Sequence, residues 1–138
     1  MVSPIAFGTW QLGGEWGGFD EDRAIAAIRH ARKLGINFFD TAQGYGFGAS
    51  ERLLAKALED DLRDARDDVV IATKGGLRPV DGGVERDSSP DFLRDGVAQS
   101  LEALGVDHID LYQVHWPDPD TPLAETGAAL AELRDEGK

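Results

Sequence analysis

The sequence predicts an α/β protein whose strands form a parallel sheet, and three observations support this prediction. Short apolar runs alternate with amphipathic stretches of helical length along the chain. The runs begin near residues 5, 36, 69 and 108, so each strand–helix unit takes roughly thirty to forty residues. The run at 69–73 is rich in β-branched residues, as is typical of a strand buried on both faces. Strands that alternate with helices in this way imply right-handed βαβ crossovers.

The first unit combines a short strand with a capped helix. We expect the strand over 5–10 and a glycine-rich loop over 13–18. A helix over 21–34 follows, because its apolar residues recur at three-residue spacing and Asp20 can accept hydrogen bonds from the first-turn N–H groups. Gly35 is expected to end this helix, since the position after a helix often requires a positive φ.

The second unit begins with a mostly apolar strand predicted over 36–41. Ser50 is predicted to cap the helix that follows, because a serine hydroxyl can accept a hydrogen bond from the first turn. This helix carries a single apolar stripe, formed by Leu54, Leu58 and Leu62.

The third unit contains the β-branched strand at 69–73 and a long connection. The segment 77–87 is expected to be a mobile loop with two glycines at its tip. Ser89 and Pro90 are predicted to open the next helix, because proline suits the first helical position. Its core-facing stripe is Leu93, Val97, Leu101 and Leu104.

The fourth unit repeats this arrangement near the C-terminus of the sequence. A strand is predicted over 108–114, and Thr121 and Pro122 are predicted to cap and open the last helix. The residues expected to face inward from that helix are Leu123, Leu130 and Leu133.

The length of these units points to a barrel. Eight such units in about 250 residues form a TIM barrel. The four units at 1–138 are therefore predicted to be half of a (β/α)8 barrel, and we treat them as one domain. A doubly wound parallel sheet also fits the spacing by itself.

Composition excludes several classes of protein. The net charge is −12, which argues against a surface for nucleic acid, because phosphate binding needs clustered Lys and Arg. The chain has no cysteine, and its three histidines lack metal-ligand spacing, so neither disulfides nor a metal site is expected. We find no apolar stretch of membrane-spanning length and no pattern of a signal peptide, and a cytoplasmic location is the simplest expectation.

Four titratable residues lie at or just after the ends of separate predicted strands. They are Asp40, Tyr45, Lys74 and His115. The carboxyl ends of parallel strands meet at one edge of the sheet, which is where β/α proteins carry their chemistry. Any one of these residues alone could be a turn, a solvated loop residue or a core histidine. Together and in this order they predict an acid–base site.

A glycine pattern after the second strand suggests a different site. Gly44, Gly46 and Ala49 spell G-x-G-x-x-A between a strand and a helix, which matches the Rossmann fingerprint. The pattern follows the second strand rather than the first, and several residues separate the strand from the glycines. We interpret it as the flexible loop that positions Tyr45.

The segments GTWQLGG, NFFDTAQGYGFGASERLLAKAL, IATKGG and HIDLYQVHWPDP resemble the aldo-keto reductase family. The similarity is closest to bacterial members related to potassium-channel β subunits, and it spans nearly the whole chain in family order. It implies that 1–138 is the N-terminal half of a (β/α)8 barrel. It also implies an NADPH-dependent oxidoreductase that reduces aldehydes or ketones to alcohols.

The resemblance assigns a role to each of the four residues. Tyr45 would be the general acid that protonates the carbonyl oxygen. Lys74 would stabilise the phenolate that remains, and Asp40 would hold Lys74 in position. His115 would orient the substrate carbonyl through a hydrogen bond.

The resemblance also implies binding residues around this site. The NADPH contacts inherited here are Gly8, Thr9, Trp10 and Asp40. The residues expected to touch the carbonyl substrate are Trp10, Tyr45, His115 and Trp116, with Trp16 as a further aromatic candidate. No metal ligand is expected.

In the family, most cofactor contacts come from the second half of the barrel, which this sequence does not contain. Half a barrel exposes strand edges and its inner face, for which Phe39 and Val114 are candidate residues. We therefore expect self-association, or a partner chain, to complete the barrel. The alternative function is a non-catalytic half-barrel fragment or an interaction scaffold.

Overall fold

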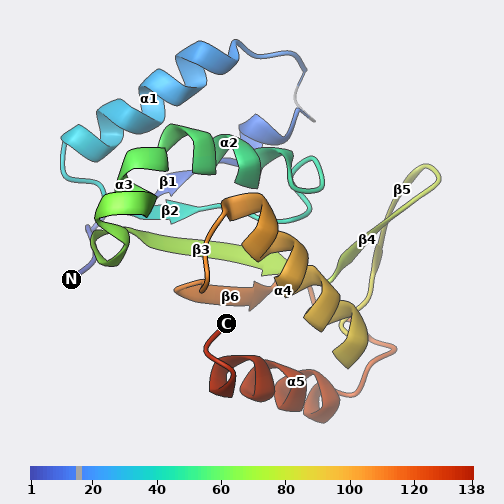
Figure 1. The fold of residues 1–138 in the computed structure, drawn as a ribbon. Helices are drawn as coiled ribbons and strands as arrows, with labels where there is room; N and C mark the ends of the chain where they lie inside the picture. The colour runs from blue at the N-terminus through green and yellow to red at the C-terminus, as the bar shows by residue number, and fades with distance from the viewer. Residues whose placement is uncertain (15–16) are drawn as a thin grey trace.

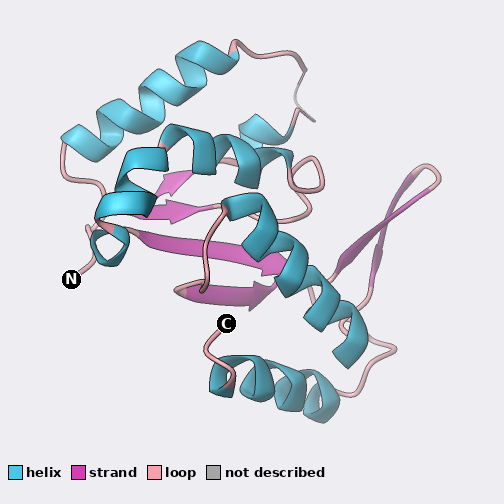
Figure 2. Ribbon diagram, viewed as in Figure 1, coloured by secondary structure: helices cyan, strands magenta, loops and turns pink. Residues whose placement is uncertain are grey.

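The computed structural model describes residues 1–14 and 17–138. A four-stranded parallel sheet has the order β1-β2-β3-β6, and helices α1, α2, α4 and α5 follow one another in the same order along it (Figures 1 and 2). The strands of this sheet are β1 (Phe7–Gly8), β2 (Phe38–Asp40), β3 (Val70–Gly75) and β6 (Leu111–Val114). This is the predicted α/β arrangement of four parallel strand–helix units.

The helices and the remaining strands fill the connections. The α-helices are α1 (Glu21–Lys33), α2 (Ala49–Ala57), α3 (Glu59–Asp64), α4 (Pro90–Leu104) and α5 (Leu123–Asp135). Two short 3-10 helices are η1 (Trp10–Gly13) and η2 (Arg66–Asp68), and a second sheet contains β4 (Leu77–Val80) and β5 (Gly83–Arg86).

The core lies between the sheet and the helices. Phe39 and Ile71 are neighbours in the register of β2 and β3, and both are fully buried. They pack with Ile28 of α1 and with Leu54 of α2 in one hydrophobic cluster. Burying a side chain of this size stabilises the fold by roughly 1.5–3 kcal/mol. The cluster therefore fixes the helices against one face of the sheet.

The expectation that Phe39 lines the inner barrel face was wrong. Successive side chains in a strand point to opposite faces, so the burial of Phe39 against helices puts Asp40 on the other face. Val114 pairs with Gly75 in the register of β3 and β6. Gly75 lies two residues after Thr73 and so faces the same side of the sheet, and the Thr73 hydroxyl donates to Glu51 of α2. Val114 therefore also belongs to the helix side by register.

The predicted cap of α1 is confirmed, whereas the predicted cap of α2 was wrong. Asp20 Oδ1 accepts a hydrogen bond from the Arg23 N–H at 3.0 Å. Helix α2 instead follows Gly48, whose φ is 91°. Ser50 lies inside the helix, and its Oγ is 2.7 Å from Thr9 Oγ1 and 3.1 Å from Thr41 Oγ1. Its hydroxyl links α2 to the ends of β1 and β2 rather than capping a helix.

Three element boundaries also differ from the predictions. The stripe of Leu54, Leu58 and Leu62 spans two helices, because the backbone leaves the helical region at Leu58 with φ −103° and ψ 15°. The first strand is shorter than predicted, since Trp10 begins η1. The fourth strand begins at Leu111 rather than at residue 108. The Ile71 N–H, which could otherwise pair with the backbone before Leu111, donates to the Asp110 carboxylate at 2.8 Å instead.

The segment 77–87 is not a loop, as we expected, but an antiparallel hairpin. Strands β4 and β5 pair from Leu77 with Arg86 to Val80 with Gly83, and Figure 1 shows them projecting from the body of the molecule. Asp81 and Gly82 form the turn, with Gly82 at φ 85°. An Asp-Gly pair between apolar residues is a recognised hairpin signal, which the sequence carried.

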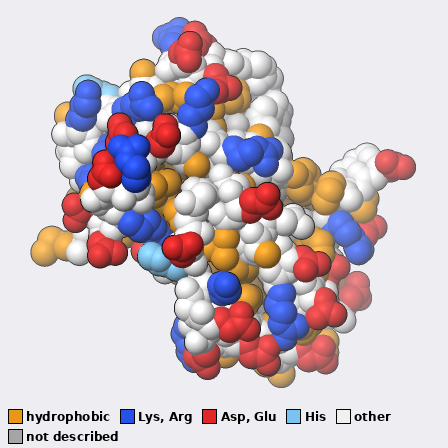
Figure 3. All heavy atoms as spheres, in the orientation of Figure 1, with side chains coloured by type: hydrophobic (Ala, Val, Ile, Leu, Met, Phe, Trp, Pro, Cys, Tyr) orange, Lys and Arg blue, Asp and Glu red, His pale blue; other side chains and the backbone are white. Residues whose placement is uncertain are grey.

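Helix α5 presents a different face to the core than the leucine pattern suggested. Its buried residues are Thr126, Ala129 and Leu133, whereas Leu123 is 79% exposed. Leu130 is half-buried beside Leu133. Hydrophobic side chains reach the surface between α4 and α5 (Figure 3). Across the part of the chain that the structure describes, no helix combines the length and apolar character that crossing a bilayer requires.

Gly75 marks the tightest contact between β3 and β6. A Cβ at this residue would lie 1.8 Å from the hydroxyl oxygen of Tyr112. We expect Gly75→Ala to lower the free energy of unfolding by roughly 2–3 kcal/mol, measured by urea denaturation. Tyr112→Phe in the same chain should restore part of this loss, because it removes the clashing oxygen.

The matched control for this substitution is Gly127→Ala in α5. A Cβ there would meet nothing within 4 Å, and alanine favours the helix by up to about 1 kcal/mol. A Gly75→Ala protein as stable as the wild type would show that β3 and β6 are not packed this closely.

Candidate active site

The C-terminal edge of the parallel sheet gathers the four titratable residues that the sequence singled out. Asp40 is the last residue of β2, and Tyr45 lies in the turn that follows. Lys74 is next to last in β3, and His115 directly follows β6. The His115 N–H donates to Gly75 O at 2.9 Å, which ties His115 to the end of β3. Three strands thus position these side chains.

The ammonium of Lys74 is held by three oxygen atoms. Its Nζ lies 2.9 Å from Asp40 Oδ1, 2.8 Å from Asp40 Oδ2 and 2.8 Å from the Thr41 carbonyl oxygen. The side chain of Lys74 is only 16% exposed, and that of Asp40 is 36% exposed. A lysine has three N–H donors, and here each finds an acceptor. The geometry fixes a positive charge at the end of β3.

Tyr45 lies directly beside this charge. The Lys74 Nζ is 5.2 Å from the centroid of the Tyr45 ring. The His115 ring meets the Tyr45 ring edge-on, with 5.6 Å between centroids and 82° between planes. The Trp10 ring stacks on Tyr45 at 6.2 Å. A phenol between an ammonium and an imidazole is a suitable proton donor, because both neighbours can stabilise negative charge on its oxygen.

The turn that carries Tyr45 is held by close backbone packing. A Cβ at Gly13 would come within 2.6 Å of the Tyr45 carbonyl carbon, so only glycine fits there. The Tyr45 N–H also donates to Ala42 O at 3.0 Å. Backbone contacts with the loop after β1 therefore help to determine where the phenol lies.

A cavity of about 330 Å³ opens in front of Tyr45 and His115. Trp10 and Trp116, which the sequence offered as candidate substrate contacts, contribute aromatic walls to this cavity. Leu77 and Val84 of the β4–β5 hairpin complete the lining, and sequence reasoning missed both residues. The Asp-Gly turn signal could have identified the hairpin, but nothing local to the sequence shows that Leu77 and Val84 line this cavity.

Thr9 and Gly8 occupy different positions beside the Lys74–Asp40 pair. Gly8 pairs with Asp40 in the register of β1 and β2, and a Cβ built on it would meet nothing within 4 Å. Thr9 is fully buried, and its N–H and Oγ1 both donate to Asp40 O, at 3.0 and 3.2 Å. The Thr9 side chain thus stabilises the end of β2 rather than lining the cavity.

Asp118 supports the segment after β6, and sequence reasoning did not select it. Its carboxylate accepts hydrogen bonds from the Ser88 N–H at 2.9 Å and from the Thr121 hydroxyl at 2.6 Å. The Ser88 N–H, followed by the Thr121 hydroxyl and the Asp120 N–H, holds the pKa of Asp118 below its usual value. Asp118 therefore links the segment of His115 and Trp116 to the entrances of α4 and α5.

Two further expectations concern residues around the site. Trp16, an aromatic candidate from the sequence, lies outside the described residues. Among residues 1–14 and 17–138, no group of three or more His, Asp or Glu side chains is arranged to hold a metal ion.

Comparison with known proteins defines the class of this protein. The sequence profile of the Aldo/keto reductase family matches residues 4–138. The chain therefore belongs to the aldo/keto reductase family, whose solved members share its arrangement of parallel β/α units of a TIM barrel. The resemblance inferred from the motifs is confirmed.

Individual members of the family are similar to the chain over nearly its whole length. It is 44% identical to the aldo-keto reductase YhdN of Bacillus subtilis, covering 99% of this chain and 41% of that protein. It is 40% identical to the NADH-specific methylglyoxal reductase of Escherichia coli, covering 99% and 46%. The glycerol dehydrogenase AKR11B4 of Gluconobacter oxydans superimposes with a TM-score of 0.88 at 40% identity, covering 99% and 42%. The chain thus spans less than half the length of these relatives.

We expect the Lys74–Asp40 pair to contribute to stability as well as to chemistry. Lys74→Met should lower the free energy of unfolding by about 1–2 kcal/mol, because it leaves a partly buried carboxylate without its counter-ion. The double variant Lys74→Met/Asp40→Asn should lose less free energy of unfolding than the two single variants lose together, in a double-mutant cycle measured by urea denaturation.

The control is Lys56→Met, which breaks an exposed ion pair of similar length. Lys56 Nζ lies 2.6 Å from Glu21 Oε1, but the two side chains are 60% and 53% exposed. This change should leave the unfolding midpoint unchanged. Additive effects of Lys74→Met and Asp40→Asn would contradict the coupling that the geometry indicates.

Proposed function

We propose that this chain carries the acid–base site of an NADPH-dependent reductase that converts aldehyde or ketone carbonyls to alcohols. The observation that carries the proposal is the Tyr45 ring lying between the fixed ammonium of Lys74, at 5.2 Å, and the His115 ring, at 5.6 Å. The relatives support the same class of chemistry, since one is named a methylglyoxal reductase and another a glycerol dehydrogenase.

In this proposal, each side chain has one task. The Tyr45 hydroxyl donates its proton to the carbonyl oxygen of the substrate. Lys74 stabilises the resulting phenolate, and Asp40 holds the ammonium beside it. His115 donates a hydrogen bond that orients the carbonyl. The nicotinamide cofactor, when bound, supplies the hydride that reaches the carbonyl carbon.

We also propose that the nicotinamide end of the cofactor is bound by Gly8, Thr9, Trp10 and Asp40. The open space at Gly8, next to Asp40 in the register, fits a flat ring lying on the inner face of the sheet. Thr9 would act through its support of the Asp40 backbone. NADPH is the proposed dinucleotide: one related structure, from Klebsiella pneumoniae, is a complex with NADPH, whereas the E. coli relative is NADH-specific.

The proposed substrate is a small carbonyl compound. The aromatic and aliphatic lining of the 330 Å³ cavity suits a small and partly apolar molecule. Trp116 would form one wall, and Arg86 lies over its ring at 5.1 Å. This contact would hold the indole in place beside His115.

The cofactor proposal is tested by titrating the purified chain with NADPH and NADH while following tryptophan fluorescence. We expect saturable quenching, because Trp10 and Trp116 both lie at the site. Tyr45→Phe should retain this binding but slow carbonyl reduction by about 100-fold or more, measured by NADPH absorbance. The control is Tyr112→Phe, since Tyr112 is the only other tyrosine in the sequence and lies on the helix side of the sheet.

Either of two results would overturn the enzyme proposal for this chain. One is a folded protein that binds neither dinucleotide, and the other is a Tyr45→Phe protein that reduces carbonyls as fast as the wild type. The first would favour a non-catalytic scaffold. A rice relative, 35% identical, is named a probable potassium channel subunit β, which makes that alternative concrete.

We further propose that additional polypeptide, from a second copy or a partner chain, covers the inner face of the sheet and completes the barrel. Leu111 in β6 is 44% exposed. It lines a largely apolar cavity of about 500 Å³ between β6 and α5, together with Leu130 and Leu133. An exposed strand edge beside such a surface favours association with further strands.

Association is measured by light scattering after size-exclusion chromatography. We expect the isolated 138-residue chain to self-associate, and Leu111→Glu to reduce the association because it places a charge on the apolar surface. Leu34→Glu, at a residue that is 71% exposed at the end of α1, should leave it unchanged. A monodisperse, cooperatively unfolding wild-type monomer would contradict this proposal.

A further inference from the structure

The β4–β5 hairpin turns one of its two faces toward the candidate active site. In an antiparallel pair, residues opposite each other share a face, and neighbours along a strand alternate between faces. The register pairs Leu77 with Arg86. Pro79 pairs with Val84, two residues further along each strand, so this pair shares the same face. Leu77 and Val84 line the cavity in front of Tyr45, which identifies this face as the inward one.

The other face of the hairpin lies away from this cavity. It carries Val80 and the pair of Arg78 and Glu85, which are opposite each other in the register. The Arg78 guanidinium lies 2.9 Å from Glu85 Oε2 and 3.4 Å from Asp87 Oδ2. Val80 is 36% exposed and lies outside the described lining of the cavity. The hairpin therefore has two exposed valines, of which Val84 faces the site and Val80 does not.

Contacts at two points hold the hairpin beside the cavity. At its base, the Asp87 N–H donates to Gly76 O at 3.1 Å. Arg86 reaches the segment after β6, since its Nη1 donates to Pro117 O at 3.2 Å and its Cζ lies 5.1 Å from the centroid of the Trp116 ring. Arg86 thus connects the inward face of the hairpin to an indole that lines the same cavity.

Leu77 is the buried part of the inward face, and Val84 is the accessible part. Leu77 is 8% exposed, and its Cδ1 would lie 3.3 Å from a Cβ built on Gly44. Two atoms of the His115 ring would lie 3.7 and 3.8 Å from the same Cβ. Leu77 and His115 therefore pack on the backbone directly before Tyr45. Val84 is 46% exposed, so its apolar surface remains for a bound molecule to cover.

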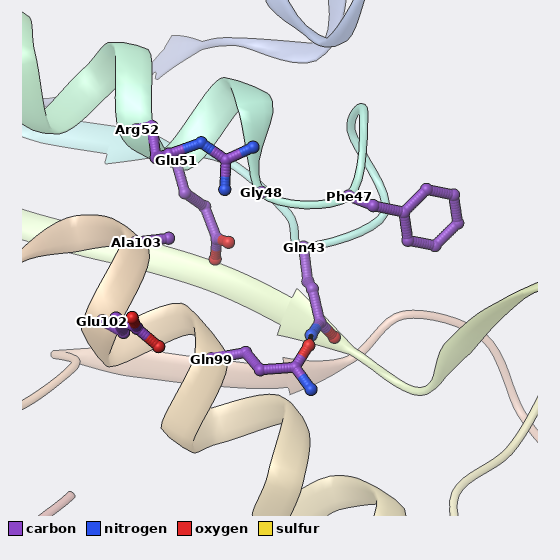
Figure 4. A pocket seen from close by; sticks show the side chains of 8 residues that line it. All are labelled: Gln43, Phe47, Gly48, Glu51, Arg52, Gln99, Glu102 and Ala103. Carbon is purple, nitrogen blue, oxygen red and sulfur yellow. Dashed lines mark hydrogen bonds between the residues drawn. The ribbon is translucent and has the colours of Figure 1, made fainter.

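A cavity between α2 and α4 offers a contrast in chemistry (Figure 4). It has a volume of about 340 Å³, and its lining includes Gln43, Glu51, Arg52 and Gln99. Figure 4 shows the Gln43 and Gln99 side chains meeting, and Gln43 Nε2 donates to Gln99 Oε1 at 2.9 Å. The cavity in front of Tyr45 has no amide, guanidinium or carboxylate side chain among its described lining residues. The candidate active site is thus the more apolar of these two cavities.

The inward face of the hairpin offers a substrate only apolar side-chain contacts. The polar side-chain atoms of the described lining belong to Tyr45, His115 and the two indoles, whereas Leu77 and Val84 have none. In the proposed function, Tyr45 and His115 are both engaged with the carbonyl oxygen. A substrate hydroxyl turned toward the hairpin would therefore lose hydrogen bonds to water without a replacement, which is unfavourable. An apolar group would instead cover the surface of Val84.

We propose that Val84 and Leu77 form a specificity-determining wall, which selects carbonyl compounds with a branched apolar substituent over polyhydroxylated ones. This inference rests on the proposed function, because that function places the carbonyl group at Tyr45. Val84 contacts the substituent, and Leu77 supports the backbone before Tyr45. Arg86 is a positioning residue, since it acts through Trp116, which it holds beside the same substituent.

Binding is measured first, because it needs neither a cofactor nor turnover. The probes are 3-methylbutanamide and 2,3-dihydroxypropanamide, which have the same number of heavy atoms and an unreactive carbonyl group. NMR of the full 138-residue chain follows the ring signals of His115 and the indole N–H signal of Trp116. We expect saturable shifts with the apolar amide, and an affinity weaker by about tenfold or more for the hydroxylated amide.

Val84→Thr tests the wall with a side chain of nearly the same shape. It places a hydroxyl on the inward face, and threonine favours strands as valine does, so the hairpin should still form. We expect the preference for the apolar amide to fall by about threefold to tenfold, because the hydroxyl gives the hydroxylated amide a hydrogen-bond partner. The control is Val80→Thr, which makes the same change on the other face and should leave the preference unchanged.

Arg86→Gln tests the positioning of Trp116. We expect the indole N–H signal of Trp116 to shift in the free protein and the affinity for the apolar amide to fall by about threefold. Arg86→Lys should restore part of this affinity, since an ammonium can also lie over the indole ring. Arg78→Gln removes the same charge from the other face of the hairpin, and it should change neither readout.

Three results would overturn the proposal: no saturable shift with either amide, equal affinity for the two amides, or a Val84→Thr preference equal to that of the wild type. Reduction of 3-methylbutanal and 2,3-dihydroxypropanal is then compared, and the preference in kcat/KM should follow the amide affinities. A chain that binds the amides selectively but reduces neither aldehyde would contradict the proposed reductase and leave the wall standing. A working reductase without preference between the aldehydes would contradict the wall alone.

Discussion

The contact on which the site depends is the one between the Lys74 ammonium and its three oxygen acceptors. Asp40 supplies two of them at the end of β2, and the Thr41 carbonyl supplies the third. The contact joins two neighbouring strands at their carboxyl ends, and it fixes a positive charge beside Tyr45. Without it, a carboxylate on the inner face would lie beside a tyrosine with no compensating cation. Structure and proposed chemistry therefore rest on the same ion pair.

The alternation of side chains along β2 and β3 divides the molecule into two regions. Phe39 and Ile71 point toward the helices and build the core, whereas Asp40 and Lys74 point toward the opposite face and build the site. A shift of one residue in register would exchange the two sets, which would bury an ion pair in the core. The same packing that stabilises the sheet therefore also selects which residues can do chemistry.

The loop after β2 connects the two cavities of the molecule. Tyr45 lines the cavity on the inner side, and Gln43 lines the one between α2 and α4. The backbone of Gln43 is tied to β3, since its N–H donates to Lys74 O at 3.0 Å. The segment that carries the proposed general acid is therefore anchored to the end of β3.

The sequence by itself determined the order of the strand–helix units, the cap at Asp20 and the position of Asp40, Lys74 and His115 at strand ends. These features follow from local periodicity and from residue preferences, which neighbouring residues in the chain decide. Only the tertiary structure decided the direction of Ser50, the face of Phe39 and the contribution of the β4–β5 hairpin to the lining of the cavity. These outcomes depend on packing between segments that are distant in the sequence, and no local sequence pattern predicts that packing.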